Sequence, residues 1–242
     1  MKKKERVMKK QRRFWMVLVT VVALTTVGFG GVVAAEEETA PQAGEKTGVE
    51  GQFVRVAETS EGFVVLGYRI ANESVNQEWM LLDVGMTVQR GVKSQKITRD
   101  QIKLVTPDKQ VIPLATQEEY EKARGLIAAM EKRDAMTGDS IDYFPPGVIN
   151  PCRIGFFADP ARLHMELAYD QVELSSTNAC VGQLYFHVPG GIQYGNYNLD
   201  VVFANSIVKV PMKIMTKQEA QDFEKKWKEE LKESRHNGHD HK

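Results

Sequence analysis

The sequence predicts a mainly β protein with a helical insertion and a C-terminal helix. Within residues 52–215, short segments alternate apolar and polar residues and are separated by turn residues, which is typical of strands in packed sheets. Two Thr-x-x-Glu capping boxes, at Thr116 and Thr216, begin segments with helical apolar spacing. Residues 1–35 differ in composition from everything that follows.

Residues 1–35 have the composition of a secretory signal peptide. Eight Lys or Arg residues are followed by an apolar run, by the small residues Val33 to Ala35, and then by three glutamates. This order predicts cleavage before Glu36 and export to the periplasm or the extracellular space. The alternative is an uncleaved N-terminal anchor, because the 22 residues from Phe14 to Ala35 are long enough to span a bilayer.

The charge of the chain argues against nucleic acid as a partner. The leader holds eight of the 32 basic and one of the 32 acidic residues, so residues 36–242 carry 24 basic and 31 acidic residues, a net charge of −7. A mildly acidic domain without a basic stripe is a poor nucleic-acid binder. Any membrane contact is expected only through residues 1–35, if they are not cleaved.

The chain then divides into a linker and a β domain. Residues 36–51 are acidic and lack an apolar period, which predicts a disordered linker. Residues 52–215 form the predicted β domain. Alternation within it predicts strands over residues 53–56, 64–70, 80–88, 102–104, 111–112, 184–188, 197–201 and 207–214.

The insertion within the β domain is expected at about residues 116–151. After Thr116, the residues Tyr120, Ile127 and Met130 recur at helical spacing, and an irregular crossover containing Pro145-Pro146 follows. A second helix is predicted over residues 216–234. Residues 235–242 contain no apolar side chain and are predicted to be a disordered tail.

One short motif favours a particular kind of sandwich. Tyr197 follows Gly195 and precedes Leu199 by two residues. A tyrosine at this place, at the start of a late strand, is typical of the tyrosine corner of immunoglobulin-like sandwiches. The predicted fold is therefore an immunoglobulin-like β-sandwich with a helical insertion and a C-terminal helix.

A loose family resemblance points the same way. The run from Phe63 to Val111, with Asp83 and Asp108, and the later strand from Gly182 to Pro189 resemble the DUF4352 or telokin-like group of exported bacterial immunoglobulin-like domains. The insertion at 116–151 departs from that group. The resemblance implies the fold and an exported location, and it implies no catalytic residue.

The two cysteines, Cys152 and Cys180, are predicted to form one structural disulfide. Paired cysteines in an exported chain are usually bonded, and their spacing is not that of a Cys-x-x-Cys redox motif. The alternative is a reactive thiol pair.

Three further groups are candidates for binding or chemistry. His236, His239 and His241 could bind a metal ion weakly, because imidazole is a good ligand but a flexible tail does not orient it. His164, with Glu166 and Asp170 nearby, could form an acid/base group of a small hydrolase. Finally, the apolar stripe of the C-terminal helix is expected to pack on its own domain or to dock a partner; it consists of Phe223, Trp227 and Leu231.

The function expected from these patterns is non-enzymatic. The sequence contains no phosphate-binding loop, nucleophile elbow or His-Glu-x-x-His motif, and no cofactor is implied. We expect an exported binding or scaffolding protein of the cell envelope, whose partner is an unidentified envelope protein or ligand. The two alternatives are a hydrolase acting through His164 and a weak metal-binding protein acting through the histidine tail.

The leader yields a direct prediction. We expect the exported protein to begin at or near Glu36, because the small residues Val33 to Ala35 suit a signal peptidase. N-terminal sequencing of the exported protein checks this expectation. An intact Met1 would contradict cleavage and support the uncleaved N-terminal anchor.

Overall fold

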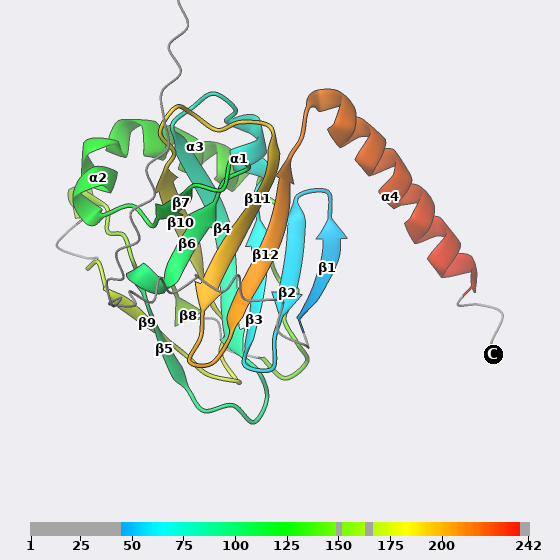
Figure 1. The fold of residues 1–242 in the computed structure, drawn as a ribbon, viewed down its shortest axis with the longest axis horizontal. Helices are drawn as coiled ribbons and strands as arrows, with labels where there is room; N and C mark the ends of the chain where they lie inside the picture. The colour runs from blue at the N-terminus through cyan, green and yellow to red at the C-terminus, as the bar shows by residue number, and fades with distance from the viewer. Residues whose placement is uncertain (1–44, 149–151, 163–166, 238–242) are drawn as a thin grey trace, which may run out of the picture. The chain divides into compact units, whose positions relative to one another are not determined.

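The computed structural model describes residues 45–148, 152–162 and 167–237. The predicted leader and most of the predicted linker lie outside these ranges. The structure is mainly β, with helices in connections between strands and at the C-terminal end (Figure 1).

The larger sheet has six strands in the order β1-β2-β3-β4-β10-β8. All neighbours in it are antiparallel except β8 and β10, which are parallel. The strands are β1 (Lys46–Gly51), β2 (Val54–Glu58), β3 (Gly62–Gly67), β4 (Trp79–Val88), β8 (Cys152–Arg153) and β10 (Cys180–His187).

The second sheet has four antiparallel strands in the order β12-β11-β6-β7. Its strands are β6 (Ile102–Val105), β7 (Val111–Pro113), β11 (Gly195–Val202) and β12 (Ile207–Ile214). A two-stranded ribbon joins β5 (Gln95–Thr98) to β9 (Gln171–Leu174), and the sequence patterns did not predict it.

One hydrophobic core lies between the two larger sheets. Leu82 and Val84 of β4 belong to the same buried cluster as Leu199 and Val201 of β11. Strand β12 also contacts β2 and β3 of the other sheet. Because successive side chains of a strand point to opposite faces, Asp83 and Gly85 lie on the face of β4 that is turned away from this core.

Helices cover that outer face. The helices α2 (Gln117–Lys122) and α3 (Arg124–Thr137) form the expected insertion, and Figure 1 shows them together at one side of the sheets. Thr116 and Glu119 make the predicted capping box. Two short 3₁₀ turns, Arg99–Gln101 and Pro160–Arg162, complete the connections.

The predicted linker 36–51 ends earlier than expected. Residues 46–51 form β1, which pairs with β2 from Lys46 opposite Glu58 to Gly51 opposite Val54. Backbone hydrogen bonds to β2 hold this edge strand, while most of its side chains are exposed. An edge strand that buries so little apolar surface leaves no apolar period in the sequence.

The strand predicted over residues 64–70 is too long. Strand β3 ends at Gly67, and the short helix α1 (Arg69–Glu73) follows it. Tyr68 and Ile70 are buried as the alternation predicts. Ile70, however, lies in α1, which packs on β4, and Tyr68 just before the helix packs edge-on against Phe53. The alternation therefore predicts the burial of these residues correctly but their backbone conformation wrongly.

The C-terminal helix α4 (Lys217–Asn237) begins as predicted and ends later. Thr216 and Glu219 make its capping box, with Thr216 N donating to Glu219 Oε2 at 2.9 Å. The helix continues through residues 235–237 of the predicted tail. Gly238, the first glycine after Thr216, follows in the sequence, and glycine has a low helix propensity. The rest of the tail lies outside the described residues.

Tyr197 occupies the place that the corner motif predicts. Its side chain is buried at 1% exposure. Its hydroxyl donates to the carbonyl oxygen of Gln193 at 3.1 Å and accepts from the Gln193 amide at 2.9 Å. The side chain thus fixes the backbone four residues upstream, as a tyrosine corner does.

Tyr197→Phe tests this hydrogen bond. Removing the hydroxyl leaves two backbone groups of Gln193 without their partner, so unfolding should become easier by about 0.5–1.5 kcal/mol. Denaturant titration measures the change. The exposed Tyr194 provides a matched control, and Tyr194→Phe should stay within about 0.5 kcal/mol of the wild type. An unchanged midpoint for Tyr197→Phe would mean that the corner contributes nothing.

Candidate functional site

The candidate site is built on a pair of polar residues in the middle of the larger sheet. Strand β4 is buried along its whole length except at Asp83, which is only partly buried. Asp83 lies directly opposite Gln183 of β10. The Gln183 amide nitrogen donates to Asp83 Oδ1 at 3.4 Å and to Asp134 Oδ2 of α3 at 2.8 Å. Gln183 therefore connects the sheet to the covering helix.

Asp83 and Asp134 form a carboxyl pair. The two side chains are within hydrogen-bonding contact of each other. Burial, followed by the charge of Asp134 and the hydrogen bond to it, raises the pKa of Asp83 to about 8. Two carboxylates in contact cannot both be ionised cheaply, so they hold one proton between them at neutral pH. Asp134 Oδ1 is buried and has no hydrogen-bond partner among the described residues.

A second set of polar groups continues from Gln183 toward α2. The Tyr185 hydroxyl lies 2.8 Å from Gln183 Oε1 and 2.7 Å from Glu131 Oε1. Arg124 then binds Glu131 at 2.8 Å and Asp159 at 2.7 Å. The site therefore contains a continuous chain of hydrogen bonds from Asp83 to Asp159.

Aromatic rings support this hydrogen-bond chain. The rings of Tyr120, Phe157 and Tyr185 lie 5.0–5.1 Å apart, centroid to centroid, in tilted and edge-on contacts. Burial, and then the neighbouring charge of Glu131, raises the pKa of both tyrosines. Both hydroxyls therefore stay neutral donors over the physiological range.

Two cavities flank this network. The polar cavity has a volume of about 440 Å³ and is lined by Tyr120, Arg124, Glu131, Asp134, Arg153 and Phe157, among others. The apolar cavity has a volume of about 690 Å³, and its lining includes Asp83, Ile141, Phe144, Val148 and Ala179. Val181, Gly182 and Gln183 of β10 line both, so the carboxyl pair stands beside the strand that separates them.

Local sequence explains how α3 presents its carboxylates. Ile127 and Met130 are fully buried and fix the face of the helix that meets the protein core. Glu131 and Asp134 are three residues apart, so they lie on one side of the helix. Phe144 beyond the helix packs over Gly85, where a Cβ atom would lie 2.3 Å from the ring. A side chain at position 85 would push this segment off the sheet.

The predicted disulfide is confirmed. Cys152 and Cys180 are bonded, with their Cα atoms 4.2 Å apart. The bond joins β8 to β10, so it holds Arg153 and Ile154 beside Gly182 at the wall of the polar cavity. A disulfide is compatible with an oxidising compartment outside the cytosol.

The histidine candidates fall mainly outside the described residues. His164, Glu166, His239 and His241 are not described, and neither is the side chain of His236. Asp170 is exposed. Across residues 45–148, 152–162 and 167–237, no group of three or more His, Cys, Asp or Glu side chains is arranged to hold a metal ion.

The apolar stripe of α4 begins on the β domain. The Arg55 guanidinium carbon lies 5.3 Å from the centroid of the Phe223 ring, and Gln52 donates to the carbonyl oxygen of Ala220 at 2.6 Å. Trp227 is half-buried, and the side chain of Leu231 is not described. Packing on the domain thus reaches Phe223, while partner docking by the stripe stays a prediction.

Sequence reasoning did not identify the carboxyl pair as a site. One signal was present, because Asp83 interrupts the apolar strand from Trp79 to Val88. A charged residue in a strand buried on both faces needs a partner or a proton. The arrangement can bind a ligand through fixed donors and acceptors, and the shared proton allows acid–base chemistry.

Comparison with known proteins assigns neither a family nor a function to this chain. No family model, curated protein or solved structure matches this chain. The resemblance to the DUF4352 or telokin-like group therefore stays a prediction. Among the described helices, none combines the length and the apolar composition needed to cross a membrane.

The raised pKa of Asp83 predicts how stability depends on pH. Between about pH 4 and pH 8 the folded chain holds a proton at Asp83 that the unfolded chain has lost. The contribution of this group to the free energy of unfolding is therefore fully present below about pH 4, and it is lost as the pH rises toward about 8. The amide in Asp83→Asn can still donate a hydrogen bond to Asp134 but does not titrate. This substitution should therefore remove the loss of stability at high pH.

Thermal unfolding of both proteins at pH 5 and pH 8 measures the effect. At pH 8, Asp83→Asn should be more stable than the wild type by at least about 1.4 kcal/mol, the free energy of a tenfold change in proton affinity. The difference should shrink at pH 5. The exposed Asp142 is the matched control, and Asp142→Asn should follow the wild type at both values. A variant destabilised equally at both values would show that Asp83 is ionised in the folded protein.

Proposed function

We propose that this protein is an exported, non-enzymatic binding protein of the cell envelope, built on an immunoglobulin-like β-sandwich. The basic and apolar leader supports export, and the disulfide is compatible with it. The two sheets around one core and the Tyr197 corner support the sandwich. Scaffolding in the envelope would use the same surfaces.

The observation that carries the binding function is the polar network between the sheet and α3, with a cavity on each side. Ligand sites are typically cavities of about 300–1,000 Å³ with a few fixed polar groups, and both cavities fall within this range. The network is held by mutual hydrogen bonds, so its groups are positioned before a ligand arrives. We therefore assign binding to the outer face of β4 and β10 beneath α3.

One observation favours hydrolysis as a second candidate. Asp83 and Asp134 are two carboxyl groups in contact that share a proton, which is a state suited to acid–base catalysis. The proposed hydrolase would use this pair, whereas the earlier candidate, His164, lies outside the described residues. The experiment that tests binding also separates the two candidates, because a hydrolase alters what it binds.

The test uses a pair of matched substitutions. Val181 lines both cavities, whereas Val111 is an exposed valine of β7 in the other sheet. Val181→Trp should fill the cavities, and Val111→Trp should add the same bulk elsewhere. Near-ultraviolet circular dichroism and thermal unfolding verify that both variants fold.

The two variants and the wild type are dialysed to equilibrium against small molecules extracted from the envelope of the producing cells. Mass spectrometry of the retained compounds should show an unaltered compound bound by the wild type and by Val111→Trp. Val181→Trp should retain at least about tenfold less, a loss of about 1.4 kcal/mol. Equal retention by all three proteins, or no retention by the wild type, would contradict the assigned site. Conversion of the compound into a product would establish the hydrolase instead.

A further inference from the structure

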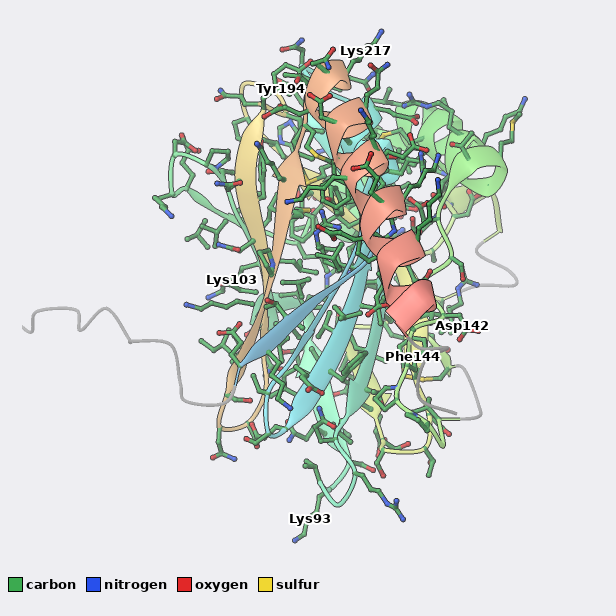
Figure 2. The ribbon with its side chains drawn as sticks, turned by 90° about the vertical axis from the view of Figure 1, so that its right-hand side faces the viewer. Lys93, Lys103, Asp142, Phe144, Tyr194 and Lys217 are labelled. Carbon is green, nitrogen blue, oxygen red and sulfur yellow. A yellow bond between two sulfur atoms is a disulfide. The ribbon has the colours of Figure 1, made fainter. Side chains whose placement is uncertain are left out.

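The apolar cavity is lined by both apolar and polar side chains. Ile141, Phe144 and Val148, from the segment that follows α3, line it together with Val181 of β10. The polar lining residues are Asp83, Ser140, Asp142 and Gln183. Asp83 and Gln183, which are hydrogen-bonded to each other, are called the polar end below. Figure 2 shows Asp142 and Phe144 on the same side of the molecule. A ligand for this cavity needs an apolar body and one polar group.

The charges around the polar end are all negative. Asp83 and Asp142 line the cavity, and Asp134 of α3 is hydrogen-bonded to Asp83. Asp139 also acts on Asp83 through its charge. No Lys, Arg or His is among the described side chains that line the cavity. The polar group of the ligand is therefore expected to be cationic rather than anionic.

A basic residue paired with one of these carboxylates, Arg69, is engaged by Asp139 and Phe53. Arg69 donates to both carboxylate oxygens of Asp139, at 3.0 and 2.6 Å, and its guanidinium carbon lies 4.7 Å from the centroid of the Phe53 ring. These contacts direct it toward Asp139 and Phe53. Asp83 and Asp134 thus have the amide of Gln183 and a proton as donors.

An ammonium group fits this arrangement of acceptors. It carries three N–H donors and no acceptor. Asp83 offers carboxylate oxygens that Gln183 reaches only weakly, at 3.4 Å. In a partly desolvated cavity, a cation beside paired carboxylates gains much more electrostatic stabilisation than in water. A hydroxyl group has a single donor and no charge, and it fits less well.

We propose that the apolar cavity binds an organic ammonium ion, with its nitrogen at the Asp83 carboxyl and its apolar body between Phe144 and Val181. This inference rests on the proposed binding function and names the ligand class of its site. The ammonium group takes the place of the proton that the carboxyl pair holds in the free protein. That proton leaves to solvent, and no other bond forms or breaks.

Proton release makes the binding depend on pH. The groups that face Asp83 are Asp134 from α3, Gln183 from β10 and, at longer range, Asp139, whose partner is Arg69. Since the pKa of Asp83 is about 8, a bound cation displaces up to one proton at neutral pH. The affinity for the cation should rise by up to about tenfold for each unit of pH and level off above about pH 8.

The test is isothermal titration calorimetry on the full mature chain with three six-carbon probes: hexylammonium chloride, hexanol and sodium hexanoate. Hexylammonium should bind at least about tenfold more tightly at pH 8 than at pH 6. In buffers of different ionisation enthalpy at pH 7, its apparent enthalpy should reveal proton release. Hexanol and hexanoate should bind at least about tenfold more weakly at pH 8.

Three substitutions complete the test. Asp83→Asn should lower hexylammonium affinity at pH 8 by at least about tenfold and abolish its pH dependence. Asp222→Asn, at an exposed position of α4 that lines neither cavity, should keep both the affinity and that pH dependence. Phe144→Ala, which removes part of the apolar lining, should weaken the binding of hexylammonium and of hexanol alike. Thermal unfolding verifies that all three variants fold.

Three results would overturn the proposal: no hexylammonium binding to the wild type, equal affinity for hexanol or hexanoate, or unchanged binding by Asp83→Asn. The dialysis experiment distinguishes failure of the ammonium proposal from failure of the proposed binding function. A retained compound that depends on Val181 but carries no cationic group would refute the ammonium ligand and leave the binding function standing.

Discussion

The shared proton between Asp83 and Asp134 is the interaction on which the arrangement of sheet and insertion depends. Asp83 lies in the middle of a strand buried on both faces, and Asp134 lies on the helix that covers one of those faces. Two ionised carboxylates there would repel each other in a partly desolvated space. One proton turns this repulsion into a hydrogen bond. Gln183 then links both carboxyls to β10, and Tyr185 extends the connection to Glu131.

The disulfide provides a second constraint on the same region. Strand β8 has only two residues, and its cysteine is bonded to the first residue of β10. Gly182 accepts the close approach of β8, because a Cβ atom there would lie 2.7 Å from the carbonyl oxygen of Ile154. The wall of the polar cavity thus depends on an oxidised pair of cysteines. This dependence connects the geometry of the site to the proposed location outside the cytosol.

The sequence predicted the features that leave a local pattern. Alternation located β4 and β12, the two capping boxes located the starts of α2 and α4, and the corner motif placed the Tyr197 side chain in the core. Each of these depends on residues close together in the chain. Strand β1 was missed because it is held by backbone hydrogen bonds to β2 and buries little.

The site was harder to predict because its parts meet only in the folded chain. Asp83 is visible as a polar interruption, but its partners come from a separate strand and from the inserted helix. Neither Gln183 nor Asp134 carries a pattern that points to Asp83. Helix α3 is also only weakly amphipathic, since the residues that it buries include Ile127 and Met130 while its polar side chains also face inward. Because polar side chains of α3 face the sheet, the outer face of β4 and β10 becomes a candidate binding site.

Carbon-13 NMR of the aspartate carboxyl groups tests the shared proton most directly. The chemical shift of each carboxyl carbon reports its protonation as the pH is raised, and Asp83→Asn and Asp134→Asn assign the two signals. The pair is expected to lose its last proton near pH 8, far above the ordinary pKa of aspartate, which is about 3.9. Two independent titrations, both complete below about pH 5, would contradict it.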